Sequence, residues 1–423
     1  MAGLVIVGAS LAGLRAAQAA RAAGFDGELV IVGEERHRPY TRPPLSKELL
    51  GGTDDDLAAC AFPCDDLDVE WRLGSAAVGL DVAAREVELA GGARVPYLTL
   101  ILATGCRARA WTGPGAELDG LHTLRHLDDA VALRADLEGA RRLVIVGAGF
   151  IGCEVAASAR KLGLDVTLID IAPLPMPALG ATLGERCAEL HRAHGVDLRL
   201  GTGIAALHGD ADGRVTAVEL ADGARVEADA VVIALGAIPN SEWLAGSGLA
   251  LEPGVVCDAT LTVAGHDDIL CAGDLAAWPH PLAGGARVRV EHWTNAAEQG
   301  TLAGRNALLA REERAPYTAV PSFWSDQYDV KIQAVGLPRQ AERVTIAEAS
   351  PEGDRFVAIG ERDGTTVTAL AFNGARRLPW YRRQVASGAA PDDVLAAVAA
   401  DPKAFGAPPA AEPSVGAAAE VRA

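Results

Sequence analysis

The stretch from Leu143 to Glu154, LVIVGAGFIGCE, constrains the fold of this chain more than any other segment. Four apolar residues predict a buried parallel strand, and Gly147, Gly149 and Gly152 then form an unbroken GxGxxG that opens a helix. A second apolar run ends at Asp170, at the usual distance for an acid that accepts hydrogen bonds from ribose hydroxyls. The spacing predicts a dinucleotide on a helix N-terminus, and the carboxylate favours NADH because it would repel a 2′-phosphate.

A second loop of the same kind lies near the start of the chain. Gly8, Ser10 and Gly13 occupy the three glycine positions of GASLAG, between an apolar strand and an alanine-rich helix. The next strand ends at Glu34 and Glu35, so the ribose position is again acidic. Two such loops in one chain predict two dinucleotides held face to face, of which the usual pair is FAD and a nicotinamide.

Charge and cysteine usage exclude several classes of function. The chain has 423 residues and a formal net charge of −18, which argues against nucleic acid and anionic membranes as partners. We see no apolar run of membrane-spanning length and no signal peptide, and the seven scattered cysteines fit reduced thiols in a cytoplasm. Cys60 and Cys64, the one close pair, are separated by a segment containing Pro63, which disfavours a redox dithiol. The histidines show no ligand spacing, so we expect no metal.

The order of the remaining segments predicts an α/β fold with two Rossmann-like domains, arranged as in glutathione reductase, and a C-terminal α+β domain with an antiparallel sheet. Apolar strands at 100–105 and 231–240 each return the chain from one domain to the other. The expected division is an FAD-binding domain from 1–109 and 236–314, an NAD-binding domain over 110–235, a C-terminal domain over 315–404 and a disordered tail over 405–423. Alternating segments at 331–335, 343–346, 355–359 and 366–370 predict the strands of the C-terminal sheet, followed by a helix near 379–386. The segment RPPLSK (42–47) by itself is typical of a surface loop, in which Ser46 caps a short helix.

Taken together, the motifs resemble the FAD-dependent pyridine-nucleotide oxidoreductases. Within them, the chain is similar to the NADH–ferredoxin reductases that supply haem monooxygenases and Rieske-type dioxygenases, the putidaredoxin and rhodocoxin reductase group. The matching motifs follow one another over residues 1 to about 390: GASLAG (8–13), RPPLSK (42–47), ATG (103–105), LRHLDDA (124–130), GAGFIGCE (147–154), LGAIPN (235–240), AGD (272–274), EHWTNAAEQG (291–300) and FWSDQYD (323–329).

The resemblance implies a role for individual residues. Lys47 matches a lysine near flavin N5, Glu154 its acidic partner, Phe150 an aromatic gate over the flavin, and Trp293 a residue packed by the flavin ring. These four are the expected catalytic residues. The expected contacts of FAD are Gly8, Ser10, Leu11, Ala12, Gly13, Glu34, Glu35, Arg42, Lys47, Ala77, Ala103, Thr104, Gly105, Arg125, Asp274, Glu291, His292 and Trp293. Those of NADH are Gly147, Gly149, Phe150, Ile151, Gly152, Glu154, Asp170 and Gly236. The chain departs from the group at Ile171, close to where relatives often carry an arginine.

The function implied is hydride transfer from NADH to FAD, followed by single-electron transfer to a [2Fe–2S] ferredoxin that serves an oxygenase. The alternatives are another acceptor (rubredoxin, a quinone or monodehydroascorbate) and a redox sensor of the apoptosis-inducing-factor type. The chain acts as a monomer or a homodimer. An acidic ferredoxin needs a local basic patch, for which the candidates are Arg305, Arg311, Arg314, Arg376, Arg377, Arg382 and Arg383; a solvated rim is the competing interpretation.

Overall fold

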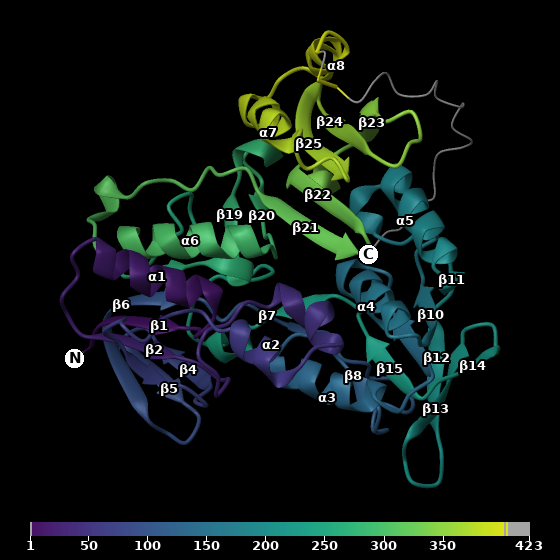
Figure 1. Ribbon diagram of the computed structural model, residues 1–423. Coiled ribbons are helices and arrows are strands. Elements are labelled where there is room, and N and C mark those ends of the chain that lie inside the picture. The colour runs from purple at the N-terminus through teal and green to yellow at the C-terminus, as the bar shows by residue number, and fades with distance from the viewer. Residues whose placement is uncertain (1, 402, 405–423) are drawn as a thin grey trace. The chain divides into compact units, whose positions relative to one another are not determined.

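The structure is a computed structural model that describes residues 2–401, 403 and 404. The tail predicted over 405–423 lies outside the described residues. The chain forms two compact units, Met1–Asp329 and Val330–Ala423, which are traced in Figure 1.

The first sheet of the larger unit holds the N-terminal glycine loop. Its strand order is β3-β2-β1-β6-β5-β4, and β18 pairs in parallel with the C-terminal half of β6. Val5 stands between Val30 and Leu100 in the parallel register, and all three are fully buried, which explains why these strands are continuously apolar. The bounds are β1 (Ala2–Val7), β2 (Leu29–Val32), β3 (Glu70–Arg72), β4 (Ala77–Asp81), β5 (Glu86–Leu89), β6 (Arg94–Leu102) and β18 (Ile269–Cys271).

Helices α1 (Leu11–Ala22) and α6 (Trp293–Asn306) pack side by side, although they lie far apart in the sequence (Figure 1). Two glycines of α6 make this approach close. A Cβ atom on Gly300 would lie 2.3 Å from the carbonyl oxygen of Ala12, and one on Gly304 would lie 2.1 Å from that of Ala16. The two helices run in the same direction through these contacts, so the N-terminus of α6 lies at the same end of the pair as the N-terminus of α1.

The second sheet repeats the arrangement around the second glycine loop. It is wholly parallel, with the order β11-β10-β9-β15-β8, and helix α4 (Phe150–Lys161) follows β9 directly. An antiparallel sheet, β12-β13-β14, packs its apolar face against the strands of the parallel one. The remaining bounds are β8 (Leu121–His122), α3 (Leu127–Leu137), β9 (Arg142–Val146), β10 (Asp165–Asp170), α5 (Ala181–Ala193), β11 (Asp197–Leu200), β12 (Ile204–Gly209), β13 (Val215–Leu220), β14 (Arg225–Glu227) and β15 (Ala230–Ile233).

Two short strands join the halves of the larger unit. β7 (Cys106–Ala108) and β16 (Ala237–Pro239) pair antiparallel as the chain leaves and re-enters the first half. Further elements of this unit include η1 (Pro43–Ser46), η2 (Glu48–Leu50), α2 (Asp54–Ala59), β17 (Val255–Val256), η5 (Gly273–Leu275), β19 (Ala276–Pro279), β20 (Arg287–Val288) and β21 (Ser322–Gln327).

The smaller unit contains four antiparallel strands in the order β22-β25-β24-β23, followed by two helices. Their bounds are β22 (Val330–Gly336), β23 (Arg343–Ala349), β24 (Phe356–Arg362), β25 (Thr365–Phe372), α7 (Leu378–Ser387) and α8 (Pro391–Ala399). The predicted fold class is confirmed, including the antiparallel C-terminal sheet. Helix α8 was not predicted.

Candidate active site

The first glycine loop leaves the N-terminus of α1 uncapped by a side chain. Gly8 has a φ of 128°, and a Cβ there would lie 2.1 Å from the carbonyl oxygen of Ala103. Ser10 is the N-cap residue of α1, but its hydroxyl makes no capping hydrogen bond to Leu11, Ala12 or Gly13. The donors of this first helical turn therefore suit an anion such as a pyrophosphate.

The two acids after β2 lie in different surroundings. Glu34 is exposed, whereas Glu35 is half-buried and accepts a hydrogen bond from Arg42 at 2.5 Å and another from Tyr40. Burial raises the pKa of Glu35, but the hydrogen bond to His126 and the charge of Arg42 outweigh it and hold the pKa well below its ordinary value. Since Glu35 is occupied by protein side chains, Glu34 is the freer of the two for a ribose.

Asp274 lies in η5, directly after β18, where a buried carboxylate meets two donors. Arg125 donates to it at 2.8 Å and the thiol of Cys106 lies 3.2 Å away. The Arg125 side chain also donates to the carbonyl oxygen of Cys106 at 2.9 Å, which fixes the guanidinium in place. Although burial opposes it, the charge of Asp274 raises the pKa of Arg125. The arrangement holds the Asp274 carboxylate, a strong hydrogen-bond acceptor, at the end of a strand.

The turn after β6 is tied to the re-entering chain. The Thr104 hydroxyl donates to the carbonyl oxygen of Asn240 at 2.7 Å, and the Asn240 amide donates back to the Thr104 carbonyl at 3.0 Å. Gly105 and Gly236 both have positive φ, 65° and 87°, and no atom would obstruct a Cβ on Gly236. Ala77, the remaining predicted contact of this half, begins β4.

Aromatic rings gather at the N-termini of α4 and α6. The ring centroid of Phe323 in β21 lies 4.9 Å from that of Phe150 and 4.5 Å from that of His292, the N-cap residue of α6. Trp293 begins α6, and its ring centroid is 6.2 Å from that of Trp324. Its indole Nε1 is buried without a hydrogen-bond partner among the described residues. Glu291 precedes these rings and is paired with Arg289 at 2.6 Å. A cluster of aromatic rings with one unused donor suits an isoalloxazine ring.

Lys47 and Glu154 form a buried ion pair, with 2.9 Å between the Lys47 Nζ and a Glu154 oxygen and side-chain exposures of 10% and 5%. Lys47 also donates to the carbonyl oxygen of Pro43 at 3.1 Å. Two serine hydroxyls also donate to the Glu154 carboxylate: Ser46 to one oxygen at 2.5 Å and Ser325 to the other at 2.7 Å. The four expected catalytic residues thus lie within one unit of the chain, on α4, on α6 and between η1 and η2.

Two predictions about RPPLSK were wrong. The segment is not a surface loop, because Leu45 and Ser46 are buried, and Ser46 does not cap a helix, because its hydroxyl is donated to Glu154. Ser46 and Ser325 are the contacts of the acid that sequence reasoning missed. Both stand inside motifs that the sequence analysis had singled out, which is the one available signal.

The second glycine loop has the same construction as the first. Gly147 has a φ of 108°, and a Cβ there would meet the carbonyl oxygen of Ala234 at 2.2 Å. A Cβ on Gly152 would lie 1.9 Å from the Gly147 carbonyl oxygen, whereas one on Gly149, the N-cap residue of α4, would meet open space. The loop is therefore closed on the strand side and open above the helix N-terminus, which suits a nicotinamide dinucleotide.

Asp170 at the end of β10 holds this loop and is only partly buried. Its carboxylate accepts hydrogen bonds from the backbone N–H of Ala148 at 2.5 Å and of Ala172 at 2.7 Å. The neighbouring side chain of Ile171 is 79% exposed, and that of Ile151 on α4 is 40% exposed. No arginine follows the acid, so nothing in this segment would attract a 2′-phosphate.

Several arginines of the predicted basic patch are held by acidic side chains or backbone oxygens of the protein. Arg311 is paired with Asp258 and Asp267, and Arg314 donates to the Asp267 carbonyl oxygen at 2.7 Å. Arg377 is paired with the fully buried Glu348 at 2.8 Å in the smaller unit. Of the other candidates, Arg305, Arg376 and Arg383 are exposed and Arg382 is half-buried.

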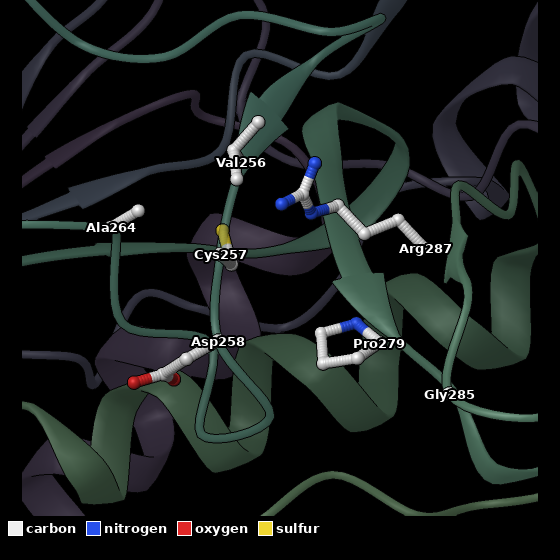
Figure 2. A pocket seen from close by; sticks show the side chains of 7 residues that line it. All are labelled: Val256, Cys257, Asp258, Ala264, Pro279, Gly285 and Arg287. Carbon is white, nitrogen blue, oxygen red and sulfur yellow. The ribbon is translucent and has the colours of Figure 1, made fainter.

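The site residues do not line the surface cavity of about 530 Å³ drawn in Figure 2. That cavity is bounded by Val256, Cys257, Asp258, Ala264, Pro279, Gly285 and Arg287. All seven cysteines are buried free thiols. Within residues 2–401, 403 and 404, no group of three or more His, Cys, Asp or Glu side chains is arranged to hold a metal ion. No helix of the described chain is long and apolar enough to cross a membrane.

Comparison with protein-family models matches residues 2–300 to the pyridine nucleotide-disulphide oxidoreductases and residues 322–404 to the reductase C-terminal domain. The rhodocoxin reductase of Rhodococcus erythropolis is 38% identical over 379 residues, which is 89% of this chain and 84% of the relative. A ferredoxin–NAD(+) reductase component of the anthranilate 1,2-dioxygenase system of Burkholderia cepacia is 38% identical over 92% of this chain and 95% of its own length.

Solved structures agree with these matches. A ferredoxin reductase of Rhodopseudomonas palustris superposes with a TM-score of 0.86 at 31% identity, over 92% of this chain and 96% of that one. The reductase in a covalent putidaredoxin reductase–putidaredoxin complex superposes with a TM-score of 0.85 at 30% identity, over 93% and 95%.

Proposed function

This chain belongs to the pyridine nucleotide-disulphide oxidoreductase family and to its ferredoxin reductase group, and we propose that it passes electrons from NADH, through FAD, to a [2Fe–2S] ferredoxin. The ferredoxin would in turn supply a haem monooxygenase or a Rieske-type oxygenase. The observation that carries this proposal is the buried Lys47–Glu154 pair in a chain with two open glycine loops.

The chain's own residues divide the work of holding two dinucleotides. The N-terminus of α1 would hold the FAD pyrophosphate, with Glu34 on the ribose and Asp274, set by Arg125, on the ribityl chain. The N-terminus of α4 and Asp170 would hold NADH. This arrangement supports the division of the chain into an FAD-binding domain (1–109 and 236–314), an NAD-binding domain (110–235) and a C-terminal domain (315–404), because the β7–β16 ribbon is where the chain crosses twice.

When bound, FAD accepts a hydride and releases electrons one at a time. The protein supplies orientation and charge for that chemistry. Lys47 presents an ammonium held in place by Glu154, and the N-terminus of α6 presents backbone donors that favour negative charge nearby. Phe150 and Phe323 form a ring contact over the end of α4 that keeps water from the space above Glu154 until a nicotinamide displaces the Phe150 ring.

Docking of an acidic ferredoxin needs exposed positive charge. After the ion pairs described above, Arg376 and Arg383 on the smaller unit are exposed, and we propose them as part of the docking face. We also propose a cytoplasmic location, which the seven free thiols support.

Anaerobic titration tests the function. Purified yellow protein is mixed with NADH or with NADPH, and a [2Fe–2S] ferredoxin and cytochrome c are then added. We expect NADH to bleach the flavin far faster than NADPH, and cytochrome c reduction to require the ferredoxin. Bleaching without electron transfer to any ferredoxin would move the function to another acceptor or to a sensor. Absence of bleaching by NADH would refute the proposal altogether.

A further inference from the structure

A row of hydrogen bonds leads from Glu154 to His191 and Tyr328, which the proposed chemistry does not use. Ser325 donates to Glu154 at 2.7 Å, and the Gln327 amide nitrogen lies 3.2 Å from the Ser325 oxygen. The Gln327 amide oxygen lies 3.1 Å from Nε2 of His191. Nδ1 of His191 lies 3.0 Å from the hydroxyl of Tyr328.

The row is enclosed from Glu154 to His191, and Tyr328 at its far end is partly exposed. Ser325, Gln327 and His191 are each 0% exposed, and Glu154 is 4% exposed. In such surroundings an unpaired donor or acceptor would cost about 1–3 kcal/mol, so each group must face a partner of the opposite kind. The direction of every hydrogen bond in the row is therefore determined by its two ends.

Chemistry fixes that direction. The carboxylate of Glu154 accepts, so Ser325 donates to it and has to accept from the Gln327 amide N–H. The Gln327 oxygen then accepts from His191, which must carry its proton on Nε2. Nδ1 of His191 is left as an acceptor for the hydroxyl of Tyr328.

Burial keeps His191 in the form that this direction requires. Desolvation lowers the pKa of His191 to about 4, against the smaller effect of the Gln327 hydrogen bond, so the ring is neutral at pH 7. The titratable and charged groups that face the row are Lys47 beside Glu154, His194 beside His191, and Cys153, Arg160 and Lys161 of α4 beside Tyr328.

The backbone shows that Tyr328 is held at a cost. Its φ is 57°, in the left-handed region that a bulky residue rarely adopts. The side chain is secured on both sides, since its ring stacks on His194 with centroids 3.6 Å apart and an interplanar angle of 12°, while its hydroxyl reaches His191.

One face of β21 brings these contacts to α4. Phe323, Ser325 and Gln327 alternate along the strand and so share a face, while Phe150 and Glu154 lie one turn apart on α4. Phe323 meets Phe150, and Ser325 meets Glu154.

We propose that Ser325, Gln327, His191 and Tyr328 form a one-way row of hydrogen-bond donors that positions the ionised Glu154 carboxylate against Lys47 during hydride transfer. They are positioning residues, and this role rests on the proposed function. If His191 takes up a proton, its Nδ1 can no longer accept from Tyr328, and the row loses the hydrogen bond from the Tyr328 hydroxyl. If Ser325 loses its hydroxyl, Glu154 loses one of its two serine donors and is more easily protonated.

The test combines kinetics with a measurement that needs no turnover. Stopped-flow bleaching of the holoenzyme by NADH is followed from pH 5 to 9 in the wild type, Ser325→Ala, Ser325→Thr and Tyr328→Phe. A hydrogen bond to a charged group is worth about one factor of ten, so Ser325→Ala should slow bleaching about tenfold and move its acid limb upward by about one pH unit. Ser325→Thr, which keeps the hydroxyl, should restore both values. Tyr328→Phe should shift the acid limb in the same direction by less.

Ser247→Ala serves as the matched control, because its hydroxyl donates to the carbonyl oxygen of Leu244 at 2.7 Å and accepts from the backbone N–H of Leu249 at 3.3 Å, both far from this row in the sequence. It should leave the pH profile unchanged. An unmoved acid limb in Ser325→Ala, with wild-type bleaching intact, would overturn the row while leaving the proposed function standing. If the wild type is not bleached at all, the function fails first.

The second readout is the nitrogen NMR spectrum of the imidazole rings in the unreacted protein. We expect His191 to appear as a neutral ring protonated on Nε2, without titration between pH 6 and 8. A charged ring, or a proton on Nδ1, would contradict the proposal whatever the kinetics show.

Discussion

Replacing Lys47 or Glu154 singly should be far more damaging than replacing both. Each change strands the other group's charge in a site where the two side chains are only 10% and 5% exposed. Removing one partner of a buried pair costs about 3–5 kcal/mol. The structure indicates that the two single changes differ.

The difference follows from the hydrogen-bond partners that each unpaired charge keeps. After Lys47→Met, the carboxylate of Glu154 retains the hydroxyls of Ser46 and Ser325, so we expect the low end, about 3 kcal/mol. After Glu154→Gln, the ammonium of Lys47 keeps the Pro43 carbonyl oxygen and meets a neutral amide in place of the carboxylate, so it has no counter-charge and we expect about 5 kcal/mol. The double variant removes both charges and should be less destabilised than Glu154→Gln alone.

Calorimetric unfolding of the holoprotein at pH 7.5 measures these differences. At about 2 °C per kcal/mol for a unit of this size, the midpoints should fall by about 6 °C and about 10 °C. Lys161→Met is the matched control, because it makes the same chemical change at an exposed lysine whose Nζ donates to the Tyr328 carbonyl oxygen, and it should lower the midpoint by less than about 2 °C. Additive effects of the two single changes would refute the reasoning, since they would mean that neither group senses the other's charge.

Three further outcomes can be checked. Ile171→Arg places a guanidinium beside Asp170, where a 2′-phosphate would sit, so the ratio of kcat/KM for NADH over NADPH should fall about tenfold in steady-state assays; an unchanged ratio would mean that the exposed side chain does not face the ribose. Arg377→Met removes the charged partner of the fully buried Glu348 and should lower the free energy of unfolding of the smaller unit by about 3–5 kcal/mol in thermal unfolding. Arg383→Glu should leave stability unchanged and raise the KM for an acidic ferredoxin. The reverse pattern would remove Arg383 from the docking face. Because the folded-state pKa of His191, about 4, lies below its unfolded value of about 6.5, the unfolded chain binds the proton first and stability should fall by about 3 kcal/mol as pH drops from 6.5 to 4, a slope that His191→Gln should remove from melting curves.

The sequence predicted well what local chemistry decides. The strand–glycine–helix units were found because each needs a tight turn and a close backbone approach within a few residues, as the 1.9 Å between a Cβ on Gly152 and the Gly147 carbonyl oxygen shows. The four strands of the C-terminal sheet were found because their apolar alternation is local too. Helix α8 was missed although Pro391, Val394 and Val398 are buried at helical spacing, because no element was assigned to this short, alanine-rich segment.

What the sequence did not predict depends on contacts between distant segments. Arg377 and Arg383 look alike within RRLPWYRR, yet Arg377 is paired with Glu348 while Arg383 is exposed. The serine donors of Glu154 lie 108 and 171 residues from it in the chain. No pattern within a window of sequence distinguishes a serine that meets a buried carboxylate from one that meets water.

Strand β21 combines the two cases, because its alternation is local whereas its contacts with α4 join distant segments. FWSDQYD is one of the motifs that carry the family resemblance, but the alternation inside it was not used. Taken as a strand, it puts Phe323, Ser325 and Gln327 on one face, and the spacing of Phe150 and Glu154 puts those two on one face of a helix. The strand face and the helix face can bring Phe323 to Phe150 and Ser325 to Glu154 in only one register. The structure has that register. A one-residue insertion before Ser325 would therefore turn the hydroxyl away from Glu154 without altering the composition of the motif, and would disconnect the acid from His191.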